Sequence, residues 1–152
     1  MRDFTPRANR RRGQSQRSKI FLVIILSIAI LLQIPYPLLD GRALEIITVL
    51  TVYFGAAAMF VHALLSFGSK FAFQYLAITT VFSFFIETVG VNTGWPFGVY
   101  EYSSTLGFFI FDVPLVVPFA WAMMAYPALI AARRVAGAVS YTHLTLPTIL
   151  RV

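Results

Sequence analysis

The 152-residue chain contains no cysteine, which excludes disulfides, thiolate metal sites and cysteine nucleophiles. Charged residues are also scarce: they make up 12% of the chain, about half the share found in soluble domains. The sequence has no P-loop, no Rossmann glycine pattern and no nucleophile elbow. No second histidine lies within reach of His62 for a metal site. We therefore expect no metal site in this protein.

What the chain has in abundance is apolar sequence: 59% of its residues are hydrophobic, and its mean hydropathy is +0.78. Four apolar stretches cover residues 20–39, 43–67, 71–91 and 108–132. Each has about twenty residues or more, enough for a helix to cross about 30 Å of hydrocarbon. The sequence thus predicts an all-α fold, a polytopic transmembrane helical bundle with four spans in a transmembrane domain at 20–134.

Basic residues gather before the first span, in a head that covers residues 1–19. Such a head can neutralise nucleic-acid phosphates or bind anionic lipid. Its position directly before a span favours a topology signal instead. Because the turns between spans are short, Lys70, Arg133 and Arg134 are expected on the same side of the membrane as the head, with Arg42 alone on the other side. We expect a multi-pass protein of the cell membrane with a cytoplasmic N-terminus, an uncleaved first helix and no nucleic-acid partner. The basic residues of the head are Arg2, Arg7, Arg10, Arg11, Arg12, Arg17 and Lys19.

The end of the chain, residues 139–152, fits neither a fifth span nor a cytoplasmic tail. Residues 139–148 read Val-Ser-Tyr-Thr-His-Leu-Thr-Leu-Pro-Thr, a decapeptide that one frame of a common transposase sequencing adapter encodes. We interpret 139–152 as a non-native, adapter-derived tail and give its His143 and Arg151 no role. A native tail is the alternative. On the first interpretation, the chain is the N-terminal part of a larger membrane protein.

Two carboxylic acids, Glu87 and Asp112, fall inside predicted spans. An ionisable group at membrane depth is costly and is by default a functional hypothesis. Each lies about 6 Å inside the same membrane boundary, at about 1.5 Å per residue, so antiparallel helices can bring the two face to face. Burial and mutual repulsion then keep at least one protonated, as a general acid requires. The alternative is that each acid only ties neighbouring helices together.

A segment rich in glycine and aromatic residues, 92–102, joins the two acids, and two prolines four residues apart, Pro114 and Pro118, follow Asp112. We expect these prolines to disturb the fourth helix and expose backbone carbonyls beside the acid, although a plain kink is as consistent. Aromatic side chains here can bind a long apolar ligand or simply lie at the headgroup interface. The candidate substrate-binding residues are Trp95, Phe97, Tyr100, Tyr102 and Trp121.

The same residues carry a resemblance to a known family. Residues 87–102 read ETVGVNTGWPFGVYEY, Leu106-Gly107 follow, and residues 112–121 read DVPLVVPFAW. This order of an acid, a Thr-Gly-x-Pro-Phe-Gly-x-Tyr-x-Tyr segment, a Val-Pro pair and a Pro-x-x-Trp segment resembles the carotenoid biosynthesis membrane proteins. That family includes the carotenoid 1,2-hydratases and bisanhydrobacterioruberin hydratase. The resemblance covers roughly residues 84–126, and family members carry further helices after the fourth.

The resemblance implies a cofactor-independent hydratase, a lyase that adds water to a terminal double bond of a carotenoid dissolved in the bilayer. A protonated Glu87 or Asp112 would donate the proton, aromatic rings would stabilise the carbocation, and the partner carboxylate would orient water. Other membrane enzymes of the carotenoid pathway are possible partners. Two alternatives remain open: a membrane enzyme similar to a lycopene cyclase, which also begins by protonating an end group, and a non-catalytic membrane module.

Overall fold

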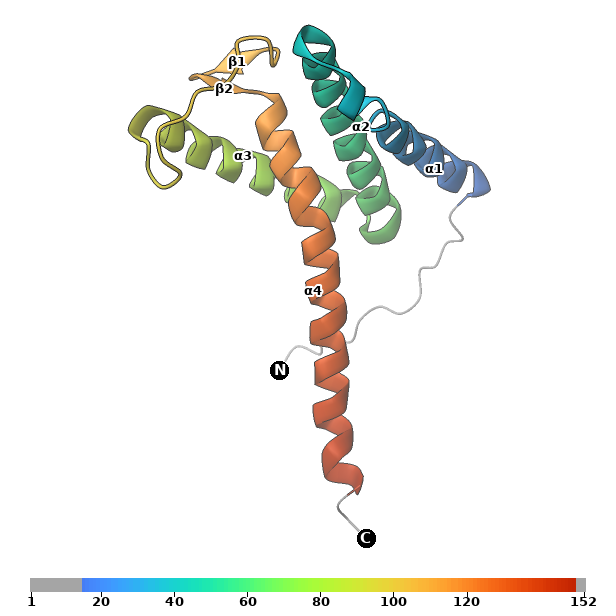
Figure 1. Cartoon of the computed structure of the whole chain (residues 1–152). Coiled ribbons are helices and arrows are strands. Elements are labelled where there is room, and N and C mark those ends of the chain that lie inside the picture. The colour runs from blue at the N-terminus through green and yellow to red at the C-terminus, as the bar shows by residue number, and fades with distance from the viewer. Residues whose placement is uncertain (1–14, 150–152) are drawn as a thin grey trace.

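Four long helices dominate the computed structural model, which describes the backbone of residues 15–149 and the side chains of residues 15–136 (Figure 1). Each forms an apolar span long enough to cross a membrane, the first of which runs from Gln16 to Leu38. The predicted all-α, polytopic bundle is therefore confirmed, and the chain is a multi-pass membrane protein. Its elements are α1 (Gln16–Leu31), the 3₁₀ helix η1 (Tyr36–Leu38), α2 (Gly41–Phe67), α3 (Ser69–Thr93), β1 (Phe109–Ile110), β2 (Val113–Pro114) and α4 (Val116–Ile149).

Glycine and proline set the helix ends. Pro35 and Pro37 follow α1, where a proline cannot continue the helical hydrogen bonds. Gly68 is the single residue between α2 and α3, and its φ of 89° favours glycine over any residue with a side chain. Gly94 ends α3 in the left-handed conformation, and its N–H donates to the carbonyl oxygen of Gly90 at 2.8 Å.

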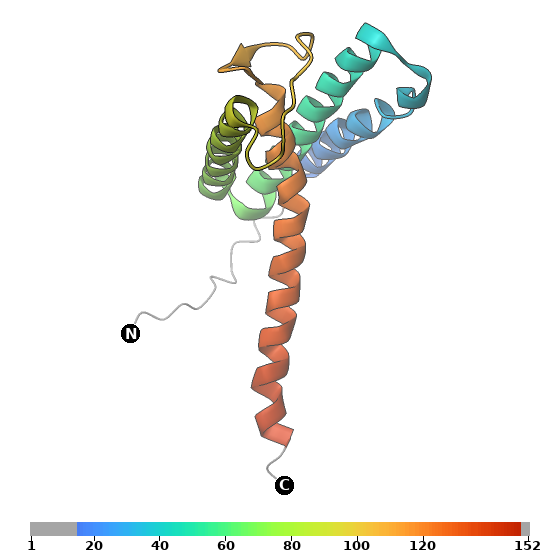
Figure 2. The same cartoon turned by 60° about the vertical axis from the view of Figure 1, so that its left-hand side comes forward.

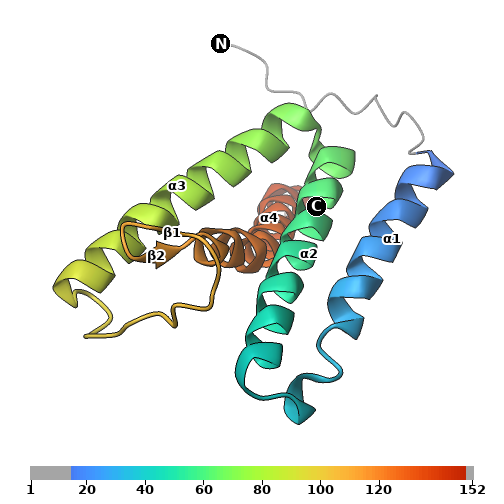
Figure 3. The ribbon, with the colours of Figure 1, turned by 90° about the horizontal axis from the view of Figure 1, so that it is seen from above.

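Helices α2 and α4 lie at the centre of the bundle. Helix α1 lies along α2, while α4 contacts both α2 and α3 (Figures 2 and 3). The buried core where α2, α3 and α4 meet is made mostly of small residues, which lets helices approach closely, as in other membrane bundles. Its members are Met59, Ala63, Ala72, Ala122 and Tyr126. Large apolar side chains such as Ile78, Phe85 and Met124 face outward instead, as expected for lipid-facing surfaces.

The fourth helix begins at Val116, so the prediction of a span from residue 108 was wrong by eight residues. Residues 109–114 form an antiparallel hairpin in which Phe109 pairs with Pro114. Pro118 lies in the first turn of α4, where a missing N–H is tolerated. The expectation that it would disturb the helix was therefore wrong. Apolar composition alone does not separate a helix from a short run of aromatic and β-branched residues, which suits a strand equally well.

Charged residues divide between the two ends of the bundle. The short turns place the start of α1, the α2–α3 turn and Arg134 on one side, and the α1–α2 turn and the 94–115 segment on the other. A hydrogen bond from Ser103 to Glu45 at 2.9 Å joins this segment to the start of α2. Among described residues, the first side carries five basic residues and no acidic one, namely Arg17, Lys19, Lys70, Arg133 and Arg134. The second side carries Asp40, Glu45, Glu101, Asp112 and a single base, Arg42.

The two ends of the chain bear on two predictions. Residues 1–14 of the basic head lie outside the described residues, and α1 already begins at Gln16, so the last residues of the head belong to the first helix. The backbone of α4 remains helical to Ile149, through most of the segment that we interpreted as non-native. The origin of that segment and the cytoplasmic position of the N-terminus stay predictions.

Candidate functional site

Glu87 is the one acidic side chain buried among the described residues, with 5% of its surface exposed. It lies on α3, less than two turns before Gly94 ends the helix, and its side chain points toward α4 and the returning 94–108 segment. A carboxyl group that leaves water needs hydrogen-bond partners to offset its desolvation. The surroundings of Glu87 supply three.

Both oxygens of the Glu87 side chain accept hydrogen bonds. Oε2 receives the hydroxyl groups of Tyr100 at 2.8 Å and Tyr102 at 2.7 Å, and Oε1 receives the indole Nε1–H of Trp121 at 2.8 Å. Two of these donors come from the loop after α3 and the third from α4. The carboxyl group therefore joins three parts of the chain that are far apart in sequence.

The alternating direction of side chains along residues 100–102 explains why two tyrosines reach one acid. Residues two apart on an extended segment face the same way, so Tyr100 and Tyr102 both turn inward while Glu101 between them is exposed. Their rings meet edge to face, with centroids 5.5 Å apart. The turn that returns the loop to α3 uses Gly94 and Gly98, and the N–H of Gly98 donates to the Gly94 carbonyl at 2.7 Å.

Burial raises the pKa of Tyr102, and its hydrogen bond to Glu87 raises the pKa further. The pKa of Tyr100 is raised by the same causes, burial first and then Glu87. Both phenols consequently remain protonated and available as donors through the neutral range. The described residues contain no group of three metal-ligating side chains, and they place no basic group in an ion pair with Glu87.

A cavity of about 330 Å³ opens beside the acid. Its walls are aromatic, and its only carboxyl group is that of Glu87, so a ligand there meets aromatic rings and a cluster of hydrogen-bonding groups at the acid. It is lined by Glu87, Phe97, Tyr100, Tyr102 and Trp121. These are five of the seven residues that the sequence singled out as candidate site residues.

The other two candidates lie elsewhere. Asp112 occupies the exposed turn between β1 and β2, with no hydrogen bond to any described residue. The prediction that it faces Glu87 from a neighbouring helix was therefore wrong. The reason is the late start of α4, which leaves residue 112 outside the helix. Trp95 is 69% exposed and does not line the cavity, which fits the alternative of an interfacial aromatic residue.

Sequence reasoning missed one residue of this site, Gly90. It lies one turn after Glu87 on α3, and a Cβ at this position would lie 2.5 Å from the hydroxyl oxygen of Tyr100. The absent side chain thus makes room for the phenol beside the acid. The signal in the sequence was the three-residue spacing of Glu87 and Gly90, which places both on one helix face.

Fold and site together define a class: a multi-pass membrane protein that buries a carboxyl group in an aromatic pocket near the membrane boundary. The family follows from comparison. A family model described as "Carotenoid biosynthesis protein" matches residues 47–150, more than half of the chain, and the chain belongs to this family. The match includes all seven candidate site residues and continues into the segment 139–150. No curated protein and no solved structure matches the chain significantly.

Proposed function

We propose that the protein is a carotenoid hydratase in which Glu87 donates a proton to a terminal double bond of a polyene held in the bilayer. The observation that carries the proposal is the burial of Glu87 in an aromatic cavity with three hydrogen-bond donors around it. Membership of a carotenoid biosynthesis family supports the substrate class. The span composition supports a substrate that reaches the site from lipid.

The proposed reaction needs only one acid. The protonated Glu87 transfers its proton to the less substituted carbon of the double bond, which leaves a tertiary carbocation at the other carbon and a carboxylate on Glu87. A water molecule forms the C–O bond at the cation, and its surplus proton returns to Glu87. One water is added, the acid is regenerated, and no electron donor or acceptor takes part. Asp112 has no step in this proposal because it lies in an exposed turn.

The three hydrogen-bond partners of Glu87 suit a group that gains and loses a proton. A tyrosine hydroxyl can donate or accept, so Tyr100 and Tyr102 can stay bonded to Glu87 in either protonation state. The indole N–H of Trp121 can only donate, which fixes Oε1 toward α4. Phe97 and Trp121 line the cavity where the positive charge would develop, and the faces of aromatic rings attract cations.

Expression of the full chain in a polyene-producing host tests the proposal. We expect wild-type protein to yield pigments that have gained one water, Glu87→Gln to yield only the precursor, and Glu87→Asp to restore part of the product. Glu101→Gln is the matched control, since it removes the same charge from an exposed residue between the two tyrosines. Pigments are identified by mass, and the amount of protein in the membrane is measured for each variant.

The outcomes separate the competing functions. A product isomeric with the precursor would indicate cyclisation, because a ring forms without gain of oxygen. Hydrated pigment at wild-type levels from Glu87→Gln would overturn the role of Glu87. Unchanged pigment from the wild-type protein, with the protein present in the membrane, would favour a non-catalytic module.

A further inference from the structure

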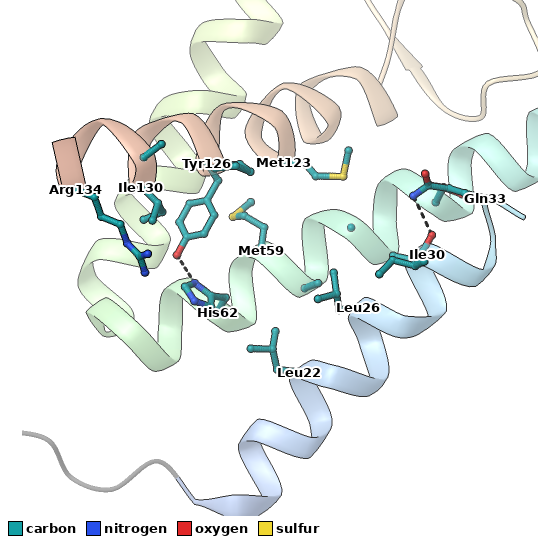
Figure 4. Close-up of a pocket in the computed structure, with 16 residues that line it drawn as sticks. Leu22, Leu26, Ile30, Gln33, Met59, His62, Met123, Tyr126, Ile130 and Arg134 are labelled. Atoms are coloured by element: carbon teal, nitrogen blue, oxygen red, sulfur yellow. Dashed lines mark hydrogen bonds between the residues drawn. The ribbon is translucent and has the colours of Figure 1, made fainter.

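A second and larger cavity, about 630 Å³, lies between α1, α2 and α4, away from Glu87 (Figure 4). The residues that line it recur every three or four positions on each helix, so each helix presents one face to it. On α4, for example, these residues are Met123, Tyr126, Ile130 and Arg134. We call this cavity the α1–α2–α4 groove.

Polar side chains lie only toward the two ends of the groove. Figure 4 shows His62 and Arg134 near one end and Gln33 near the other, with Leu26 and Met59 between them. Nδ1 of His62 lies 2.7 Å from the hydroxyl oxygen of Tyr126, a hydrogen bond that links α2 to α4. The middle of the groove therefore suits a hydrocarbon chain, and the Arg134 end suits a negatively charged group.

The length of the groove matches one leaflet of a bilayer. The eleven residue steps from Met123 to Arg134 rise about 16 Å along α4, at about 1.5 Å per residue. Half of a hydrocarbon core about 30 Å thick is about 15 Å. One lipid of the leaflet nearest Arg134 can thus lie along the groove with its head group at that end.

The charges at this end favour an anionic head group. The described residues on this side of the bundle include five basic side chains and no acidic one. The guanidinium of Arg133 lies over the rings of Phe67 and Phe71, 5.4 Å and 4.7 Å from their centroids. Arg134 lines the groove instead, and none of the described acidic residues forms an ion pair with it.

We propose that the α1–α2–α4 groove binds one anionic glycerophospholipid, with an acyl chain along Leu26 and Met59 and the phosphate at Arg134. The proposal goes beyond the carotenoid chemistry and does not depend on it, because the groove shares no lining residue with the cavity at Glu87.

The test is native mass spectrometry of the full chain in detergent micelles that contain phosphatidylglycerol or phosphatidylcholine with the same acyl chains. We expect one retained phosphatidylglycerol and a preference of about fivefold over phosphatidylcholine, the effect of one basic residue at an anionic surface. Arg134→Gln abolishes the preference, whereas Arg133→Gln, the matched control with the same charge change, keeps it. Equal losses in both variants, or no preference in the wild type, would overturn the proposal.

A second pair of variants tests the groove itself. Ala58 is buried and lines the groove, while the neighbouring Ala57 is exposed outside it. We expect Ala58→Leu to reduce retention of both lipids several-fold and Ala57→Leu to retain them as the wild type does. Full retention by Ala58→Leu would contradict the site. Displacement of the bound lipid by a long-chain polyene added to the same micelles would make the groove a polyene site and also contradict the proposal.

Discussion

The hydroxyl oxygen of Tyr100 lies where a side chain at Gly90 would have to be, 2.5 Å from an ideal Cβ at that position. Gly90 is one helical turn from Glu87, and the same hydroxyl donates to Glu87 Oε2. Glycine at position 90 therefore leaves the space that the Tyr100 hydroxyl occupies when it bonds to the acid.

A coupled pair of variants tests this relationship. Gly90→Ala should destabilise the protein by about 1–3 kcal/mol, the usual cost of overpacking. In a Tyr100→Phe background the colliding oxygen is absent, so the same change should be neutral or stabilise by about 0.5–1 kcal/mol, as alanine does in a helix. Unfolding of each variant in detergent gives the free energies. Equal effects in both backgrounds would show that the two residues are not coupled.

Tyr102→Phe should also destabilise the protein, by about 1–3 kcal/mol, because the buried Glu87 loses one of its three donors. The hydroxyl of Tyr36 bonds Thr48 at an exposed position, so Tyr36→Phe is the control and should change stability by no more than about 0.5 kcal/mol. We expect hydrated pigment to fall with Tyr102→Phe and to remain with Tyr36→Phe. A stability loss in the control as large as that in Tyr102→Phe would argue against a special role for the tyrosine at the acid.

The helices could be predicted from the sequence, but the structure of residues 108–115, which lead into α4, could not. Long apolar runs predict spans because length and composition decide membrane insertion. The first three predicted spans start and end within a few residues of the apolar helical segments, the first of which, Gln16–Leu38, includes both α1 and η1. Residues 108–115 are as apolar as a helix, yet Gly107 and Pro114 bound a hairpin whose turn residues Phe111 and Asp112 both have positive φ. Positive φ at two non-glycine residues has no clear sequence signal.

The site shows the same division. Glu87, the two tyrosines and Trp121 were identifiable, since an acid at membrane depth and clustered aromatics are unusual in any sequence. Their hydrogen bonds were not, because the path of a loop of more than twenty residues decides which side chains return to α3. The prediction that Glu87 pairs with Asp112 was wrong because it assumed that residue 112 was helical, whereas this residue lies in the segment that leads from α3 to α4.

Asp112 now gives a sharp comparison with Glu87. Asp112→Asn should leave hydrated pigment unchanged, while Glu87→Gln abolishes it. Asp112→Gly should keep activity and raise stability by about 0.5–1 kcal/mol, because φ of 64° is favourable for glycine and costly for aspartate. Pigment mass and thermal unfolding measure the two effects. Loss of product in Asp112→Asn, with the protein present in the membrane, would return Asp112 to the reaction.

The orientation of the bundle can be measured because the chain has no cysteine of its own. Val99 is 97% exposed in the loop that returns to Glu87, and Ser69 is exposed at the start of α3, on the opposite side of the bundle. The excess of basic residues on the Ser69 side predicts that this side is cytoplasmic. A membrane-impermeant thiol reagent applied to intact cells should therefore label Val99→Cys and leave Ser69→Cys unlabelled until the cells are permeabilised. The reverse pattern would invert the topology and place the mouth of the Glu87 pocket at the cytoplasmic surface, while labelling of both variants in intact cells would contradict a bundle with one fixed orientation.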